Sequence, residues 1–236
     1  MSVSQTFLNY SCPLKRLMKI ATGFHNLRLF FTGLTTCIAL CSASAVLGQT
    51  MAPDELVRKL TEDVLAAVKA NENIQAGSVS QIQALVESKV LPYVNFRKMT
   101  ASAVGRNWSQ ATPEQQKQIT DQFRQLLIYT YSGALAKVRD QEVQYRPFRS
   151  DPADNIVQVE MRIINKGEEP IQLKYKLEKG GSDWKITDVN ILGVWLVENY
   201  RNTFQQEVTR GGIDGLIKTL AQKNQSLANA ANRRVR

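Results

Sequence analysis

The stretch Val157–Leu177, VQVEMRIINKGEEPIQLKYKL, decides the fold class of this chain. Apolar and polar residues alternate on both sides of Lys166-Gly167-Glu168-Glu169-Pro170, a segment rich in turn formers. An alternation with period two is typical of strands that bury one face, and so short a link makes the two strands antiparallel neighbours. The stretch therefore predicts a β-hairpin.

The two faces of this hairpin differ in polarity. One face carries Gln158, Glu160, Arg162, Gln172, Lys174 and Lys176, so it is wet, and the apolar face must be covered. Val143 and Tyr145 alternate in a preceding strand, and Gly180-Gly181-Ser182-Asp183 links the hairpin to a strand from Trp184 to Ile191. The pattern predicts an antiparallel sheet of about four strands.

Helical periodicity flanks the sheet on both sides. Before it, apolar spacing predicts helices over 54–70, from Ser80 to before Pro92, through 96–104, and from Thr112 to about Ala136. The last of these opens with a capping box formed by Thr112 and Gln115. Two more helices follow the sheet, one through Tyr200 and Phe204 and one through Leu216 to Leu220, with a break at Gly211-Gly212. The fold class is α+β, with helices packed on one face of a curved antiparallel sheet.

Residues 1–45 have the composition of a signal peptide. Lys15, Arg16, Lys19 and Arg28 precede an apolar run over 29–40, and Ala43-Ser44-Ala45 fits the small-x-small cleavage rule. The run is too short for a permanent membrane anchor. We expect cleavage after Ala45, with a cut after Gly48 or a start at Met18 as alternatives. Export predicts a protein that works outside the cytoplasm, and we expect one domain over 46–224 and a disordered basic tail over 225–236.

The distribution of cysteine and histidine limits the chemistry of the mature chain. Cys12, Cys37, Cys41 and His25 all lie in the leader, so disulfides, thiolate or histidine catalysis and nearly every zinc or haem site are excluded, and we expect no metal and no cofactor. The leader holds four of the 30 basic residues and none of the 21 acidic ones, which leaves 26 − 21 = +5. Because these charges are scattered, we expect no nucleic-acid partner.

Carboxylates remain as candidates for catalysis. Asp188 and Asn190 end the last strand near Glu198, and paired carboxylates could act as general acid and base. A capped strand-to-helix turn explains them more simply. The segment Gly211-Gly212-x-Asp214-Gly215 follows a helix and lacks the Lys-Ser/Thr of a nucleotide site, which favours a helix C-cap over a phosphate loop. The sequence therefore favours a binding protein over an enzyme.

Six groups of residues carry a resemblance to a known family. The first three are Leu91-Pro92-Tyr93-x-Asn95-Phe96, Gly105-Arg106-x-Trp108-x-x-Ala111-Thr112-Pro113-Glu114-Gln115 and Phe123-x-x-Leu126-Leu127-x-x-Thr130-Tyr131. The others are Trp184-Lys185-x-x-Asp188-Val189, Gly193-Val194-x-Leu196-Val197-x-x-Tyr200-Arg201-x-x-Phe204 and Gly212-x-Asp214-Gly215-Leu216-Ile217-x-x-Leu220. In this order, over 53–224, they resemble the MlaC (toluene-tolerance) family. Asn95 and Trp195 depart from its usual aspartate and serine.

The resemblance implies a periplasmic phospholipid-binding protein, an auxiliary component of an ABC transporter. Such proteins shuttle phospholipid between an inner-membrane MCE/ABC transporter complex and an outer-membrane lipoprotein-porin complex, and they help maintain the lipid asymmetry of the outer membrane. The implied fold is an NTF2-like cone with a helical extension, acting as a monomer. Two alternatives remain: a carrier for a hopanoid or another apolar ligand, and a small carboxylate enzyme on an NTF2-like fold.

The apolar faces of the predicted elements supply the candidate lipid site. A carrier must enclose acyl tails, because about 0.8 kcal/mol per methylene group opposes their exposure to water. The residues expected to line the tail cavity are Phe123, Leu127, Val157, Val159, Met161, Leu173, Tyr175, Leu177, Val197 and Phe204. None of them is ionisable at neutral pH, which predicts binding without catalysis.

Overall fold

A computed structural model describes residues 51–164, 167 and 169–234. The helices before the sheet are α1 (Pro53–Lys69), α2 (Glu72–Gln75), α3 (Val79–Leu85), α4 (Phe96–Val104) and α5 (Pro113–Leu135). The strands are β1 (Glu142–Tyr145), β2 (Ile156–Ile164), β3 (Ile171–Gly180), β4 (Asp183–Ile191) and β5 (Val194–Trp195), and α6 (Leu196–Arg234) follows them. This order of elements confirms the predicted α+β class.

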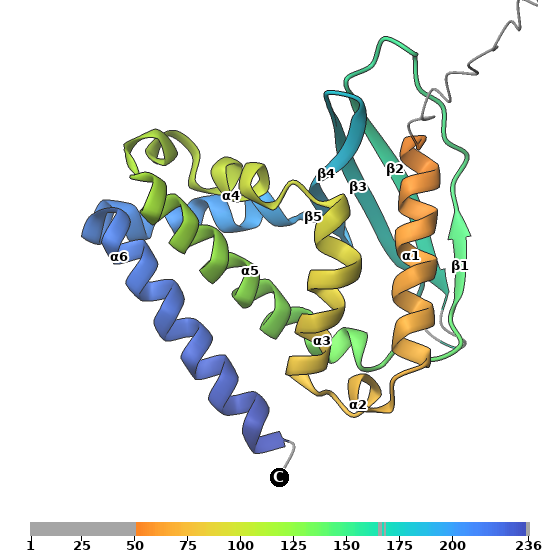
Figure 1. Ribbon diagram of the computed structural model, residues 1–236, viewed down its shortest axis with the longest axis horizontal. Helices are drawn as coiled ribbons and strands as arrows, with labels where there is room; N and C mark the ends of the chain where they lie inside the picture. The colour runs from red at the N-terminus through yellow and green to blue at the C-terminus, as the bar shows by residue number, and fades with distance from the viewer. Residues whose placement is uncertain (1–50, 165–166, 168, 235–236) are drawn as a thin grey trace, which may run out of the picture. The chain divides into compact units, whose positions relative to one another are not determined.

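The sheet is an antiparallel meander in the order β1-β2-β3-β4-β5 (Figure 1). Val159 faces Tyr175 across β2 and β3, and Glu160 faces Lys174, whose Nζ lies 2.8 Å from the Glu160 Oε1. Apolar and polar side chains therefore lie on opposite faces of the sheet, as the sequence predicts. Between β3 and β4 the register shifts at Leu177, so one residue of β4 has no partner, and such a bulge increases the local twist of a sheet.

The fifth strand, β5, was not predicted. Leu192 and Gly193 have φ angles of 52° and 90°, the positive pair that a two-residue hairpin turn requires, and the chain folds back so that Val194 pairs with Ile191. Trp195, which stands where the family usually has serine, lies in this strand and pairs with Asn190. The Leu-Gly dipeptide is a weak turn signal, because leucine seldom adopts a positive φ.

The predicted helix starts are confirmed where capping residues mark them. The Thr112 Oγ1 accepts a hydrogen bond from the Gln115 backbone N–H at 3.2 Å, and the Gln115 Oε1 accepts one from the Thr112 N–H at 2.9 Å. Asn95 caps α4 through its Oδ1, 3.0 Å from the Lys98 backbone nitrogen. Its amide supplies the acceptor that a helix N-terminus needs.

The second predicted helix differs from the expectation at its C-terminal end. The α-helical part stops at Leu85, and a π-helical turn over Val86–Val90 leads into a 3-10 turn over Leu91–Tyr93. Pro92 therefore lies within the helical path. It is tolerated there because it occupies the first turn of the 3-10 segment, where its missing N–H needs no partner.

Two apolar clusters form most of the core. The sheet cluster, between α1 and the sheet, contains Leu56, Val57, Leu60, Val157, Val159, Met161, Leu177 and Ile186. The helix cluster, among α4, α5 and α6, contains Met99, Ala103, Val104, Ile119, Phe123, Leu126, Leu196, Val197, Phe204, Leu216 and Leu220. A third cluster, Val68, Ile74, Ile82, Leu85 and Ile128, joins the far ends of α1, α3 and α5.

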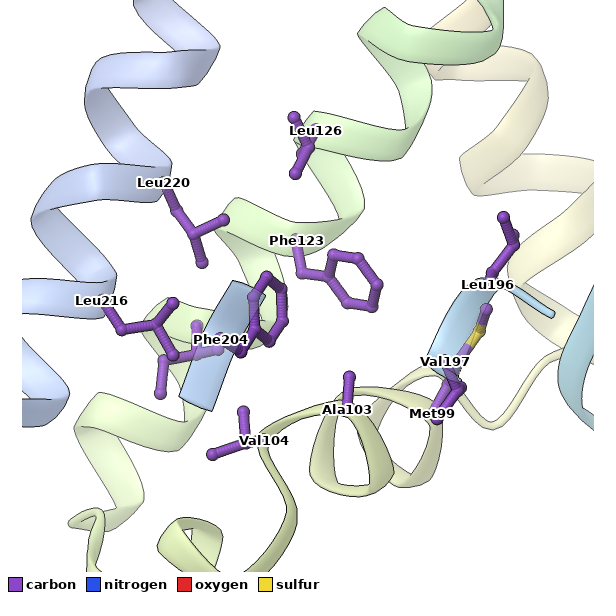
Figure 2. Close-up of a cluster of buried hydrophobic side chains, with 11 residues drawn as sticks. Met99, Ala103, Val104, Phe123, Leu126, Leu196, Val197, Phe204, Leu216 and Leu220 are labelled. Carbon is purple, nitrogen blue, oxygen red and sulfur yellow. The ribbon is translucent and has the colours of Figure 1, made fainter. Parts of the chain in front are cut away.

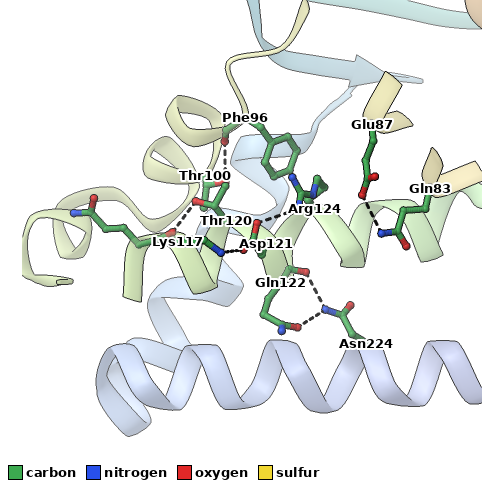
Figure 3. Close-up of polar contacts among 11 residues, drawn as sticks. Gln83, Glu87, Phe96, Thr100, Lys117, Thr120, Asp121, Gln122, Arg124 and Asn224 are labelled. Carbon is green, nitrogen blue, oxygen red and sulfur yellow. Dashed lines mark hydrogen bonds and ion pairs between the residues drawn. The ribbon is translucent and has the colours of Figure 1, made fainter. Parts of the chain in front are cut away.

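Helix α6 is bent and longer than predicted. Gly211 and Gly212 have non-helical backbone angles, which confirms the predicted break, and the part after it lies beside α5 (Figure 1). The Asn224 Nδ2 donates to the Gln122 carbonyl oxygen at 2.9 Å (Figure 3). Residues 225–234, expected as a disordered tail, are helical, because Leu227 packs on the helix cluster and the alanine-rich sequence favours a helix.

The predicted signal peptide, residues 1–45, lies outside the described residues. Within the described ranges, no helix is both long and apolar enough to cross a bilayer.

Candidate functional site

The ten predicted tail-binding residues fall into the two main clusters. The sheet cluster buries four of them, Val157, Val159, Met161 and Leu177, with Leu173 and Tyr175 partly buried against it. The helix cluster buries Phe123, Val197 and Phe204, with Leu127 partly buried against it. The structure thus brings the residues of each group together, but the ten residues do not form one continuous surface.

The sheet group forms a ladder of cross-strand pairs on one face of the sheet. Its pairs are Val157 with Leu177, Val159 with Tyr175, and Met161 with Leu173. Residues of β2 are nearly fully buried, whereas Leu173 and Tyr175 of β3 keep some exposure. Leu173 and Tyr175 can therefore still gain apolar contact, whereas Leu177 of the same strand is fully buried.

Tyr175 brings a hydroxyl group to this apolar face. Burial raises the pKa of Tyr175 to about 12, and the neighbouring Tyr145 adds to the rise. The phenol is therefore neutral at physiological pH. It offers an amphipathic group, apolar along the ring and polar at its tip, and no charge.

The helix group is built around one aromatic ring. The ring of Phe123 lies 5.1 Å from that of Phe204 and 5.0 Å from that of Tyr200, both edge-to-face, and 5.6 Å from that of Phe96 (Figure 2 shows Phe123 and Phe204). Such geometry stabilises aromatic pairs beyond the area that they bury. Phe96 and Tyr200 were absent from the predicted site, although both stand in the sequence motifs quoted above.

Two valines lie at the junction between the clusters. Val94 and Val189 are half-buried, and each packs against both the sheet cluster and the helix cluster. Val94 also pairs with Ile186 of β4 through an isolated parallel bridge, which ties the start of α4 to the sheet. Sequence periodicity could not assign them, because Val94 lies between elements and both contacts are tertiary.

The carboxylate candidates have structural partners. The Asp188 Oδ1 accepts backbone hydrogen bonds from Val189 at 2.8 Å and from Val197, in the first turn of α6, at 3.1 Å. Burial raises the pKa of Asp188, although these two bonds and nearby cations act against the rise. Glu198 is exposed, and the Asn190 Oδ1 accepts from the Gly193 N–H at 3.0 Å. This arrangement is the capped strand-to-helix turn.

Within the described ranges, no three histidine, cysteine, aspartate or glutamate side chains converge as metal ligands would.

Two surface hollows lie outside both groups. One of about 240 Å³ is lined by Arg97, Pro113, Gln116, Lys117, Thr120 and Asp121. The other, of about 790 Å³, is lined by Lys98, Ala101, Ser102, Gly105, Arg106, Trp108, Ser109, Arg201 and Gln205. Neither is lined by a predicted tail-binding residue.

Most of the described sequence, from within α1 to the part of α6 that follows the break, matches a single family. The family model described as "MlaC protein" matches residues 58–222, which span every element described above except the ends of α1 and α6. This chain belongs to the MlaC family. The resemblance stated from the sequence motifs is confirmed over nearly the same range.

Relatives of this MlaC-family chain include two curated proteins. The intermembrane phospholipid transport system binding protein MlaC of Haemophilus influenzae is 24% identical over 83% of this chain and 93% of its own length. The toluene tolerance protein ttg2D of Pseudomonas putida is 24% identical over 86% of this chain and 97% of its own.

A solved structure resembles this MlaC-family chain as well. It is the phospholipid-binding protein from Ralstonia solanacearum in complex with a phospholipid, 44% identical in sequence, with a TM-score of 0.72. The match covers 74% of this chain and 98% of that one.

Proposed function

We propose that this chain is a periplasmic phospholipid carrier that shields acyl tails between its sheet cluster and its helix cluster. The observation that carries the proposal is the likeness to the phospholipid-bound protein of Ralstonia solanacearum, at 44% identity over 98% of that chain. At such identity the two chains share their fold. The Haemophilus relative is by name a binding protein of an intermembrane phospholipid transport system, which supports the same class.

The physical requirement for such a carrier is a large apolar enclosure. Two acyl chains hold about thirty methylene groups, and at roughly 0.8 kcal/mol each their exposure would cost on the order of 20 kcal/mol. Leu127, Leu173 and Tyr175 are each half-buried, so they can still gain contact with a tail. Val94 and Val189, which touch both clusters, mark where the tails would separate them. This junction is the proposed tail site.

The direct test identifies the ligand that the protein acquires in the cell. The protein is purified from the periplasm without detergent, and its organic extract is analysed by mass spectrometry. We expect diacyl phospholipid in stoichiometric amount. An extract that contains a hopanoid instead would favour the alternative ligand, and an extract without lipid would contradict the proposal.

Crosslinking tests the tail site itself. Photo-reactive side chains at Val159 and Leu173, which lie on the apolar face, should capture lipid acyl chains. Lys174 is the matched control, because it neighbours Leu173 on β3 but its side chain pairs with Glu160 on the polar face. Equal capture at Lys174 and Leu173 would contradict the assignment of the faces.

We further propose that the carrier is a monomer that shuttles lipid between an inner-membrane MCE/ABC transporter complex and an outer-membrane lipoprotein-porin complex. Buried tails need a receiving apolar surface, so transfer requires contact with a partner. Purified protein loaded with labelled lipid should exchange it with each complex in vesicles, and should not lose it to buffer. Equal loss to buffer would contradict the shuttle.

The rival function is a carboxylate enzyme. Asp188 is engaged in capping α6, and Glu198 is exposed, which argues against an acid and base pair. We expect Asp188→Asn and Glu198→Gln to leave lipid content unchanged. Turnover of phospholipid by the wild type that stops in either variant would replace the carrier by an enzyme.

A further inference from the structure

The larger surface hollow joins two sequence motifs that the tail site does not explain. Arg106 and Trp108 belong to the 3-10 turn over Gly105–Gln110, and Arg201 and Gln205 belong to α6. The Arg201 Nε donates to the carbonyl oxygen of Ser102 at 3.3 Å, and Ser102 lies in α4, the helix that leads directly into this turn. Residues of α4, the 3-10 turn and α6 together line an open surface hollow with a volume of about 790 Å³.

The side chains that line this hollow are mainly hydrogen-bond donors. Three are cations, Lys98, Arg106 and Arg201, and Ser102, Ser109, Trp108 and Gln205 add hydroxyl, indole and amide groups. No carboxylate is among the lining residues. Such a set favours a ligand with several anionic acceptor oxygens.

The two arginines are exposed, and they have no acidic partner within 4 Å among the residues described. Lys98 differs, because it pairs with Glu178 of β3. The nearby Asp188 accepts two backbone hydrogen bonds through its Oδ1, from Val189 and Val197, and Arg201 acts on it only at a distance, as one of the cations that oppose the rise of its pKa. The positive charge of the hollow is therefore mainly that of Arg106 and Arg201, and it is available to a ligand.

Among the hollow residues of these motifs, Trp108 packs against the helix cluster, whereas Arg106, Arg201 and Gln205 take no part in its apolar packing. On α6, Tyr200 and Phe204 supply the apolar contacts of the helix cluster, whereas Arg201 and Gln205 face the hollow. Gly105 has a φ of 67°, and a Cβ there would lie 3.6 Å from the Gln205 Nε2. The backbone turn that presents Arg106 thus depends on glycine, since other residues seldom adopt this conformation.

We propose that this hollow binds the phosphate of a phospholipid headgroup presented at a membrane surface, and so docks the carrier there. The proposal rests on the proposed carrier function. Arginine matches phosphate oxygens with two donors at once, and tryptophan is enriched where a protein meets lipid headgroups. A phosphate carries its charge on one compact group, which suits two arginines that line one open hollow better than carboxylates spread over the face of an acidic protein partner.

The test compares vesicle binding by two double variants of the mature protein. Arg106→Gln with Arg201→Gln removes the charge of the hollow. Arg146→Gln with Arg149→Gln is the matched control, because it removes equal charge from exposed positions after β1. The vesicles consist of uncharged galactolipid with either phosphatidylglycerol or oleate at equal surface charge. Co-sedimentation measures binding, and titration with glycerol 1-phosphate measures the free phosphate ester.

We expect the hollow variant to bind phosphatidylglycerol vesicles about tenfold more weakly than the wild type, and the control variant to bind nearly as well as the wild type. Oleate vesicles should bind weakly and alike in all three. Equal losses in both double variants, or equal binding of both vesicle types, would show a general charge effect and overturn the proposal. Binding of glycerol 1-phosphate without vesicle binding would also overturn it, in favour of a soluble ligand.

Two readouts separate this proposal from the carrier function. The lipid content of the hollow variant should equal that of the wild type, because no tail-site residue is changed, and its unfolding temperature should fall only slightly, because Arg201→Gln removes one exposed hydrogen bond, to Ser102. A wild type without any extracted lipid would contradict the carrier function while the vesicle assay still reports on the hollow. Normal vesicle binding by the hollow variant, together with lost transfer to a partner complex, would assign the hollow to an acidic protein and overturn membrane docking.

Discussion

Tyr175 links the apolar face of the sheet to the stability of the protein in alkali. Its pKa is about 12 in the folded protein and 10.0 ordinarily, so between these values the folded state keeps a proton that the unfolded chain loses. The free energy of unfolding should therefore fall as pH rises from 10 to 12, by about 1.4 kcal/mol per pH unit. Urea unfolding at pH 9 and pH 11 measures this loss.

The variant Tyr175→Phe keeps the ring and removes the titrating group, so its loss of stability between these pH values should be smaller. Part of the loss should remain, because burial also raises the pKa of Tyr131, Tyr145 and Tyr200. An identical pH dependence in wild type and variant would mean that Tyr175 is not buried in solution.

Two substitutions of Asp188 can distinguish what its acceptor oxygen and its negative charge each contribute to the free energy of unfolding. Its Oδ1 accepts from Val197 at the start of α6, so Asp188→Ala should lower the free energy of unfolding by about 1 to 2 kcal/mol. Because burial raises the pKa of Asp188, the ionised form is disfavoured in the folded state, and Asp188→Asn should cost much less. Urea unfolding of both variants at pH 7 checks this, and equal costs would contradict it.

The break within α6 is an element whose shape depends on one glycine. Gly212 has φ 66° and ψ −166°, which other residues avoid, whereas Gly211 has φ −141°. A Cβ at either position would meet nothing within 4 Å, so backbone strain is the only difference between them. Gly212→Ala should cost about 1 to 3 kcal/mol and Gly211→Ala less. Thermal unfolding of the pair measures the difference, and a larger cost at Gly211 would contradict this backbone geometry.

At the scale of the whole molecule, the tail site requires that the two clusters part around the lipid. Leu126 is 6% exposed and Leu127 is half-buried, although they are neighbours on α5. Leu126→Ala should cost about 2 to 5 kcal/mol in the lipid-free protein, as a core truncation does. Leu127→Ala should destabilise the lipid-free protein less and reduce the lipid retained after purification. Full lipid retention by Leu127→Ala would place the tails elsewhere.

The sequence by itself determined the class and order of the elements. Strands β2, β3 and β4 follow from alternation in Val157–Leu177 and Trp184–Ile191, and α5 begins where Thr112 and Gln115 form their capping box. Both are local signals, because a strand's faces and a helix cap depend on residues within a few positions of one another. The family motifs, which run from Leu91 to Leu220, indicated the MlaC family, and the family model that matches residues 58–222 confirms it.

Only the tertiary structure decided which side chains share a surface. In the structure the ten predicted tail-binding residues are divided between two clusters, which meet at Val94 and Val189. The turn at Leu192 and Gly193 returns the chain to pair with β4 as β5. The tertiary structure also brought Arg201 to Ser102, 99 positions away in the chain, and so created the basic hollow with Arg106. Periodicity states which face of an element is apolar, but the packing of elements against one another decides what that face meets.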